Sequence, residues 1–212
     1  MKLNKEDLLL YGVTDSKWTG EKTLEMQVEE ALRGGATFIQ LREKHLDEDS
    51  FVELAYKLKA VCAKYHVPFV INDNIDVCLK VDADGVHVGQ EDMACANARK
   101  LLGPDKIIGV SAHNVEEALK AQNDGADYLG VGAVFGTTSK DNVTEMSKET
   151  LLAITKAVDI PVIAIGGINE TNVTKLKDTG IVGVAVISAI FAKKDIVAST
   201  QELKKLVIDT VC

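Results

Sequence analysis

The feature that most constrains the fold is an alternation, repeated along the chain, of short runs rich in Val, Ile and Gly with longer amphipathic stretches. The short runs are typical of buried strands, and apolar residues spaced three and four apart are typical of helices that cover a sheet. Eight runs are predicted to be strands, namely residues 8–15, 37–44, 68–73, 85–89, 106–113, 128–135, 161–167 and 183–190.

Helical spacing is clearest in residues 23–35, 48–66, 114–126 and 149–158, each of which lies between two predicted strands. Eight strands at a spacing of about 26 residues, separated by helices, favour a closed (β/α)8 TIM barrel over the alternative, an open doubly wound sheet. No linker or change of composition divides the sequence, so residues 1–212 are expected to form a single (β/α)8 barrel domain.

Charge and composition narrow the classes of function. The net charge of −8 argues against a nucleic-acid partner, although a local cluster of Lys, Arg and metal can still bind a small anion in an acidic protein. The sequence has no signal peptide pattern and no apolar stretch of about 20 residues, so we expect a cytoplasmic protein with no membrane partner. The four cysteines lack metal-ligand spacing and are expected to be reduced.

Candidate ligand-binding residues are sought where strands end, because active sites of TIM barrels lie at the C-terminal ends of the strands. Strand alternation puts Phe38, Gln40, Arg42 and Lys44 on one face of the second predicted strand. The guanidinium of Arg42 and the ammonium of Lys44 would suit a phosphate at the mouth of the barrel. A salt bridge to the barrel rim is the alternative interpretation.

Carboxylates follow the next two predicted strands. Asn72 and Asp73 end the third strand, and Asp92 follows the fourth within Gln90-Glu91-Asp92. Carboxylate oxygens suit Mg²⁺, which also shares sites with substrate phosphate oxygens. Asp73 and Asp92 each precede a predicted helix, so helix capping is the alternative.

Two histidines and a serine lie on the fourth and fifth predicted strands. His87 and His113 are expected to be hydrogen-bonded core or rim residues, with direct chemistry as the alternative for each. Ser111 could donate a hydrogen bond to a phosphate. No third residue stands at a spacing typical of a Ser-His-Asp triad.

The last three strands are followed by segments suited to anions. Hydroxyls and an ammonium after the sixth strand could close over an anion, although the segment lacks the Walker pattern. Gly166-Gly167 and Ile187-Ser188 follow the seventh and eighth strands, where barrels often bind a phosphate. Simple turns are the alternative at both places. The anion-binding segment after the sixth strand consists of Thr137, Thr138, Ser139 and Lys140.

Taken together, these residues resemble the thiamine phosphate synthase family along nearly the whole chain. The order and spacing of the matching stretches are more specific than any single motif, and the family fold is a (β/α)8 barrel. The stretches are YGVTD (11–15), IQLREK (39–44), VINDN (70–74), DGVHVGQED (84–92), IGVSAH (108–113), GADYLGVGAVF (125–135), residues 137–140, VIAIGGI (162–168) and GVAVISAI (183–190).

The resemblance implies an enzyme, a transferase that joins 4-amino-2-methyl-5-(diphosphomethyl)pyrimidine to 4-methyl-5-(2-phosphoethyl)thiazole, or to its carboxylated tautomer. The products are thiamine phosphate and diphosphate. Both substrates are small molecules. A homo-oligomer is compatible with the sequence.

Carried over residue by residue, the resemblance implies three sets of site residues. Arg42, Lys44 and Lys140 are the catalytic set, which would stabilise the leaving diphosphate. One Mg²⁺ per subunit would be bound by Asp73 and Asp92. The residues implied to hold the pyrimidine diphosphate are Gln40, Leu41, Arg42, Glu43, Lys44, Asn72, Ser111 and Lys140, and those implied to hold the thiazole phosphate are Thr137, Thr138, Ser139, Gly167, Ile187 and Ser188.

The chain departs from the family pattern in one loop. Ala133 and Gly136 stand where the family has prolines, and Ser139 replaces a threonine. Without the prolines the loop can sample more conformations before it closes. Three rival functions remain open from the sequence: a thiazole tautomerase, another phosphate-binding barrel such as a sugar-phosphate epimerase or isomerase, and a catalytically silent binding protein.

Overall fold

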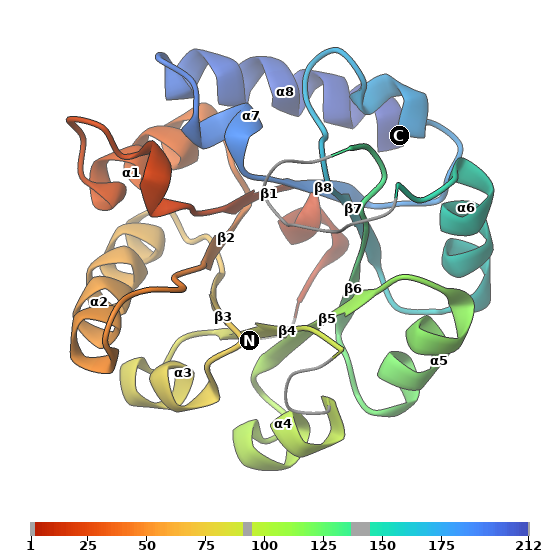
Figure 1. The fold of residues 1–212 in the computed structure, drawn as a ribbon, viewed down its shortest axis with the longest axis horizontal. Helices are drawn as coiled ribbons and strands as arrows, with labels where there is room; N and C mark the ends of the chain where they lie inside the picture. The colour runs from red at the N-terminus through yellow and green to blue at the C-terminus, as the bar shows by residue number, and fades with distance from the viewer. Residues whose placement is uncertain (1–2, 91–94, 137–144, 212) are drawn as a thin grey trace.

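The computed structural model describes residues 3–90, 95–136 and 145–211, and its eight parallel strands form a closed barrel surrounded by helices (Figure 1). Each strand pairs with its neighbour in sequence, and β8 pairs with β1, so the (β/α)8 prediction is confirmed and the open-sheet alternative is wrong. The strands are β1 (Leu10–Val13), β2 (Phe38–Leu41), β3 (Phe69–Asn72), β4 (Gly85–Val88), β5 (Ile107–Ala112), β6 (Tyr128–Gly132), β7 (Val162–Ile165) and β8 (Gly183–Val186).

All eight strands are shorter than predicted, and two of the differences affect the site. The chain leaves β2 after Leu41, so Arg42 and Lys44 lie beyond the sheet. The eighth predicted strand, 183–190, ends at Val186, and its remainder forms the short helix α7 (Ser188–Phe191). The amide of Phe191 donates to the carbonyl of Ile187 at 2.9 Å, which is the helical bond that replaces sheet pairing.

Short polar side chains start most of the helices. Thr23, Asp47, Asn74, Asn114 and Ser147 each accept a hydrogen bond from a backbone N–H in the first turn of the helix that follows. Such caps stabilise a helix by about 1 kcal/mol each. The helices on the outside of the barrel are α1 (Leu24–Gly34), α2 (Glu48–Lys64), α3 (Ile75–Val81), α4 (Cys95–Leu102), α5 (Val115–Asn123), α6 (Lys148–Ala157) and α8 (Ile196–Val211).

Short 3-10 helices complete the described chain. They are η1 (Lys5–Leu8) before β1, η2 (Ser16–Trp18) after it, and η3 (Val173–Leu176), which takes the place of an α-helix between β7 and β8. Throughout the described ranges, every helix is too short or too polar to span a bilayer.

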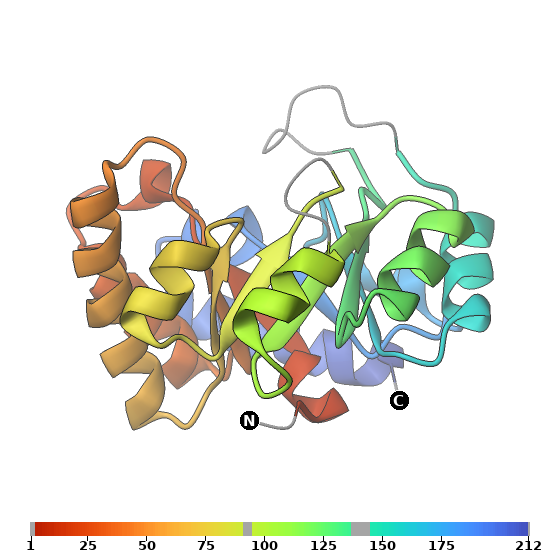
Figure 2. The same ribbon diagram turned by 90° about the horizontal axis from the view of Figure 1, so that it is seen from below.

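Strand alternation divides the core into two clusters. One cluster packs the outer strand faces against the helices, and the other fills the barrel with Tyr11, Phe38, Tyr128 and their neighbours. These three rings lie 4.5 to 6.0 Å apart between centroids. Leu8 of η1 joins the inner cluster, and η1 lies at the end of the barrel opposite the loops that follow the strands (Figure 2). Side chains therefore fill the N-terminal half of the barrel and leave the other end for a site.

Candidate functional site

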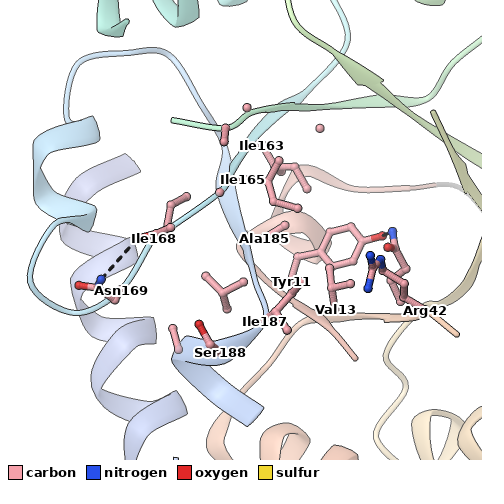
Figure 3. Close-up of a pocket in the computed structure, with 18 of the residues that line it drawn as sticks. Tyr11, Val13, Arg42, Ile163, Ile165, Ile168, Asn169, Ala185, Ile187 and Ser188 are labelled. Atoms are coloured by element: carbon pink, nitrogen blue, oxygen red, sulfur yellow. Dashed lines mark hydrogen bonds between the residues drawn. The ribbon is translucent and has the colours of Figure 1, made fainter. Parts of the chain in front are cut away.

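A cavity of about 650 Å³ lies at the C-terminal end of the barrel and is lined by residues from all eight strands. Its size is typical of pockets for small molecules. Isoleucines and Ala185 lie between Arg42 on one side and Ser188 and Asn169 on the other (Figure 3). The cavity thus has an apolar middle with polar groups on two sides, which suits a ligand or ligand pair with separated polar ends.

Four of the residues predicted from the sequence to hold the pyrimidine diphosphate line this cavity. Gln40 is buried inside the barrel, and Arg42, Asn72 and Ser111 line the cavity with it. The backbone N–H of Arg42 donates to Thr14 Oγ1 at 3.0 Å, which fixes the chain where it leaves β2. The Arg42 guanidinium has no ion-pair partner among the described residues, so the rim salt bridge considered for it is not found there.

The structure places Leu41, Glu43 and Lys44 away from the cavity lining. Leu41 is fully buried in the outer core, as the alternation of β2 requires. Glu43 accepts a hydrogen bond from Ser16 in η2, and Lys44 is exposed beyond the strand end. For Leu41 and Glu43, a ligand role would therefore have to use backbone groups, whereas Lys44 could reach a ligand with its side chain.

Asp73 is an exposed carboxylate at the end of β3, beside the cavity-lining Asn72. Its backbone has a φ of 62°, its N–H donates to the carbonyl of His87 at 2.9 Å, and its Oδ2 accepts from Asn72 Nδ2 at 2.5 Å. Among the described residues, no three His, Cys, Asp or Glu side chains lie close enough together to hold a metal ion without further ligands. One carboxylate beside a cavity lined by Arg42 and Asn72 still fits Mg²⁺, which usually takes one or two carboxylates together with substrate phosphates and waters.

Five predicted site residues lie outside the described ranges. They are Asp92, the second predicted metal ligand, and Thr137, Thr138, Ser139 and Lys140 of the loop after β6.

The side of the cavity away from Arg42 is formed by the segments after β7 and β8. Gly167 has a φ of 62°, and a Cβ there would lie 2.4 Å from the carbonyl oxygen of Gly136, so only glycine allows these two loops to approach. Asn169 and Asn172 both donate to the carbonyl of Gly167, the first bond being the dashed line in Figure 3. Ile187 and Ser188 line the cavity at the start of α7.

Both histidines are hydrogen-bonded, as expected for core and rim residues. His87 lies inside the barrel with Nδ1 3.0 Å from Tyr128 Oη and Nε2 3.1 Å from Ser111 Oγ. His113 at the rim contacts Glu117, with 2.9 Å between Nδ1 and Oε2. Burial raises the pKa of Glu117, but the hydrogen bonds from His113 outweigh it and the net shift is downward.

Part of the cavity lining was not predicted from the sequence. Tyr11 and Ile163 line the cavity from the strands, and Lys193 and Glu170 form an ion pair of 2.6 Å at its edge. The inward residues of β1 and β7 could have been found by alternation. The pairing of Lys193 with Glu170 could not, because it joins two loops whose approach depends on the closed barrel.

The chain is similar to known proteins along nearly its whole length. The family model described as thiamine monophosphate synthase matches residues 10–190. The thiamine-phosphate synthase of Clostridium tetani is 51% identical over 197 residues, which cover 93% of this chain and 94% of the relative. That of Methanobrevibacter smithii is 51% identical over 204 residues, covering 96% and 97%. The structure of thiamine phosphate pyrophosphorylase from Pyrococcus furiosus superposes with a TM-score of 0.89 at 41% identity, covering 98% of this chain and 99% of that one.

Proposed function

Because the chain belongs to the thiamine monophosphate synthase family, and its activity is therefore the synthesis of thiamine phosphate, we propose roles for the individual residues of the cavity. Arg42, Asn72 and Ser111 hold the diphosphate of the pyrimidine substrate, together with Lys44 and with Lys140 of the loop after β6. The observation that carries this proposal is that a guanidinium without an ion-pair partner among the described residues faces the same cavity as Asn72 and Ser111.

Bond breaking is proposed to come first. The C–O bond between the pyrimidine methylene and diphosphate breaks, the electron pair leaves with the oxygen, and a cation remains on the methylene. The positive charges of Arg42, Lys44 and Lys140 stabilise the negative charge that grows on the leaving group. When bound to Asp73 and Asp92, one Mg²⁺ per subunit would supply further charge neutralisation at the same oxygens.

Bond formation is proposed to follow on the other side of the cavity. Gly167, Ile187 and Ser188, with Thr137, Thr138 and Ser139, hold the phosphate of the thiazole. The thiazole nitrogen is then held within about 3.5 Å of the methylene carbon and attacks it, so orientation replaces activation of the nucleophile. This step uses an existing lone pair and needs no general base.

We also propose that the two small-molecule substrates are the chain's ligands in a cytoplasmic setting, without a nucleic-acid or membrane partner. The net charge of −8 supports the first exclusion. If the protein forms a homo-oligomer, we propose that each subunit has a complete cavity of its own, because the lining comes from all eight strands of one barrel.

The decisive experiment measures release of diphosphate with each substrate alone and with both, in the presence and absence of Mg²⁺. A synthase working as proposed releases diphosphate at the full rate only when both substrates and the metal are present. Because the C–O bond is proposed to break first, slow release without the thiazole phosphate is compatible with the mechanism. Release that is equally fast without the thiazole phosphate, or that continues unchanged in chelator, would contradict it.

A variant at Lys140 sharpens the assignment. Lys140→Ala is expected to lower kcat more than it raises KM for the pyrimidine diphosphate, because a contact to a leaving group strengthens as charge develops. An unchanged kcat with only a raised KM would show that Lys140 binds the ground state alone.

A further inference from the structure

A chain of hydrogen bonds crosses the interior of the barrel and joins two of the proposed ligand-binding residues. Gln40 Nε2 donates to Tyr11 Oη at 2.8 Å, and the two phenol oxygens of Tyr11 and Tyr128 lie 2.9 Å apart. Tyr128 Oη lies 3.0 Å from His87 Nδ1, and His87 Nε2 lies 3.1 Å from Ser111 Oγ. This chain of hydrogen bonds therefore runs from a residue of β2 through residues of β1, β6 and β4 to a residue of β5.

The barrel interior buries this chain of hydrogen bonds and leaves space for its side chains. Tyr11 and Tyr128 are 1% and 0% exposed, and burial raises the pKa of both phenols well above the ordinary value, so each keeps its single O–H hydrogen. A Cβ at Gly109 would lie 2.1 Å from Tyr128 Cζ, and one at Gly130 would lie 3.0 Å from His87 Cε1. Two strand positions thus lack side chains where the phenol and the imidazole need space.

Each hydroxyl of the chain has one hydrogen, so the direction of one bond sets the direction of the next. With the Gln40 amide donating, the hydrogen of Tyr11 is directed to Tyr128, and that of Tyr128 to His87 Nδ1. The imidazole is then the neutral form with its hydrogen on Nε2, which donates to Ser111. The hydrogen of Ser111 is left for a partner in the cavity that Ser111 lines.

The opposite direction would have different consequences at both ends. Gln40 would turn its carbonyl oxygen toward Tyr11, and the hydroxyl of Ser111 would donate its hydrogen to His87 Nε2. The amide orientation in the structure corresponds to the first direction, which leaves an acceptor on Gln40 and a donor on Ser111. An anion beside Ser111 requires that donor.

We propose that Tyr11, Tyr128 and His87 are positioning residues that fix the hydrogen-bond direction of Gln40 and Ser111 together. They make Ser111 a donor to the diphosphate and leave the Gln40 oxygen to accept from the amino group of the pyrimidine. The inference rests on the assignment of Gln40 and Ser111 to the pyrimidine diphosphate made above. None of the three residues needs to touch the substrate for this role.

The first test uses variants that keep shape and remove hydrogen bonds. Tyr128→Phe is expected to lower kcat/KM for the pyrimidine diphosphate by about tenfold or more, while KM for the thiazole phosphate stays within about twofold. His87→Gln retains one donor and one acceptor and should keep more activity than His87→Leu. Tyr56→Phe is the matched control, because it removes a 2.7 Å hydrogen bond to the carbonyl of Lys80 on the outside of the barrel.

The second test reads the direction itself. In protein labelled with ¹⁵N-histidine, the His87 signals, assigned by their loss in His87→Gln, should report the Nε2–H tautomer in the parent enzyme and a mixture in Tyr128→Phe. An Nδ1–H tautomer in the parent would overturn the inference. So would a Tyr128→Phe enzyme that loses affinity equally for both substrates, or one that matches the parent.

These outcomes are separable from failure of the proposed function. A parent enzyme that releases no diphosphate with both substrates would overturn the function, whereas a fully active parent with kinetically silent Tyr128→Phe and His87→Leu would overturn only the positioning role.

Discussion

The two ends of the barrel use polar side chains in opposite ways. At the N-terminal end, Thr37, Asp84 and Asp127 directly precede β2, β4 and β6, and each pairs with the preceding strand. Their side-chain oxygens accept from the N–H of Leu10, Phe69 and Ile108 at 2.9, 2.8 and 2.7 Å, and their own N–H groups donate to the carbonyls of the same three residues. Val182 is the equivalent residue before β8. Its side chain cannot accept a hydrogen bond, so only its backbone N–H bonds to the preceding strand, at the carbonyl of Val162.

At the C-terminal end, the polar side chains are directed to a cavity. Arg42, Asn72 and Ser111 line it, and the Arg42 guanidinium is without an ion-pair partner in the described part of the chain. The three side chains at the first end satisfy the backbone, whereas these three at the second end face the cavity. The comparison teaches that one fold can separate stability from function by strand direction alone.

The largest effect is expected from Arg42→Ala. Removing a charge that stabilises a leaving diphosphate should lower kcat/KM by about 100- to 1,000-fold. Thermal unfolding should not change, because no described side chain depends on the guanidinium. Arg33→Ala, on the exposed face of α1, is the matched control for steady-state kinetics and calorimetry. A clear fall in Tm for Arg42→Ala would remove the contrast between the two ends.

The converse change is Arg99→Ala. The Arg99 guanidinium donates to the carbonyls of Gly103, Lys106 and Gly125 and to Asp127 Oδ2, all at the N-terminal end. Because Asp127 is 38% exposed, water can replace part of this network, and we expect a loss of about 2 kcal/mol in the free energy of unfolding. Denaturant unfolding measures this loss. Activity per folded molecule should equal that of the Arg33→Ala control; a deficit would show that the two ends are coupled.

A smaller loss of stability, about 1 kcal/mol, is expected for Asp84→Ala, because the N–H of Phe69 loses its side-chain acceptor. Asp84→Thr should recover much of it, since Thr37 accepts from Leu10 in the same arrangement. Denaturant unfolding with all three proteins measures the difference. If Asp84→Thr is no more stable than Asp84→Ala, the repeated pairing before the even strands is not what stabilises this end.

The sequence predicts the functional end better than it predicts what supports it. Alternation correctly turns Gln40 inward and Leu41 outward, because the period of a strand is a local property. The segment 187–190 was assigned to a strand in error, since its apolar residues suit a strand and a buried helix equally. Tyr11 and Tyr128, 117 residues apart, meet only through the curvature of the closed barrel, which no local pattern contains.

The outer core, which lies between the strands and the helices, provides the weakest expected effect. Cys62, Cys78 and Cys95 are buried among the outer helices and strands, and burial raises the pKa of Cys78 and of Cys95 to about 11. With such values, about one thiol in a thousand is a thiolate near pH 8, and burial also blocks access to reagents.

Iodoacetamide should therefore leave these three residues unmodified in the native protein and should modify all three in guanidinium chloride, as mass spectrometry can resolve by site. Diphosphate release should be unchanged by the native treatment. Rapid modification of Cys78 or Cys95, without denaturant, would mean that the helices open locally and that the outer core is less rigid than either end of the barrel.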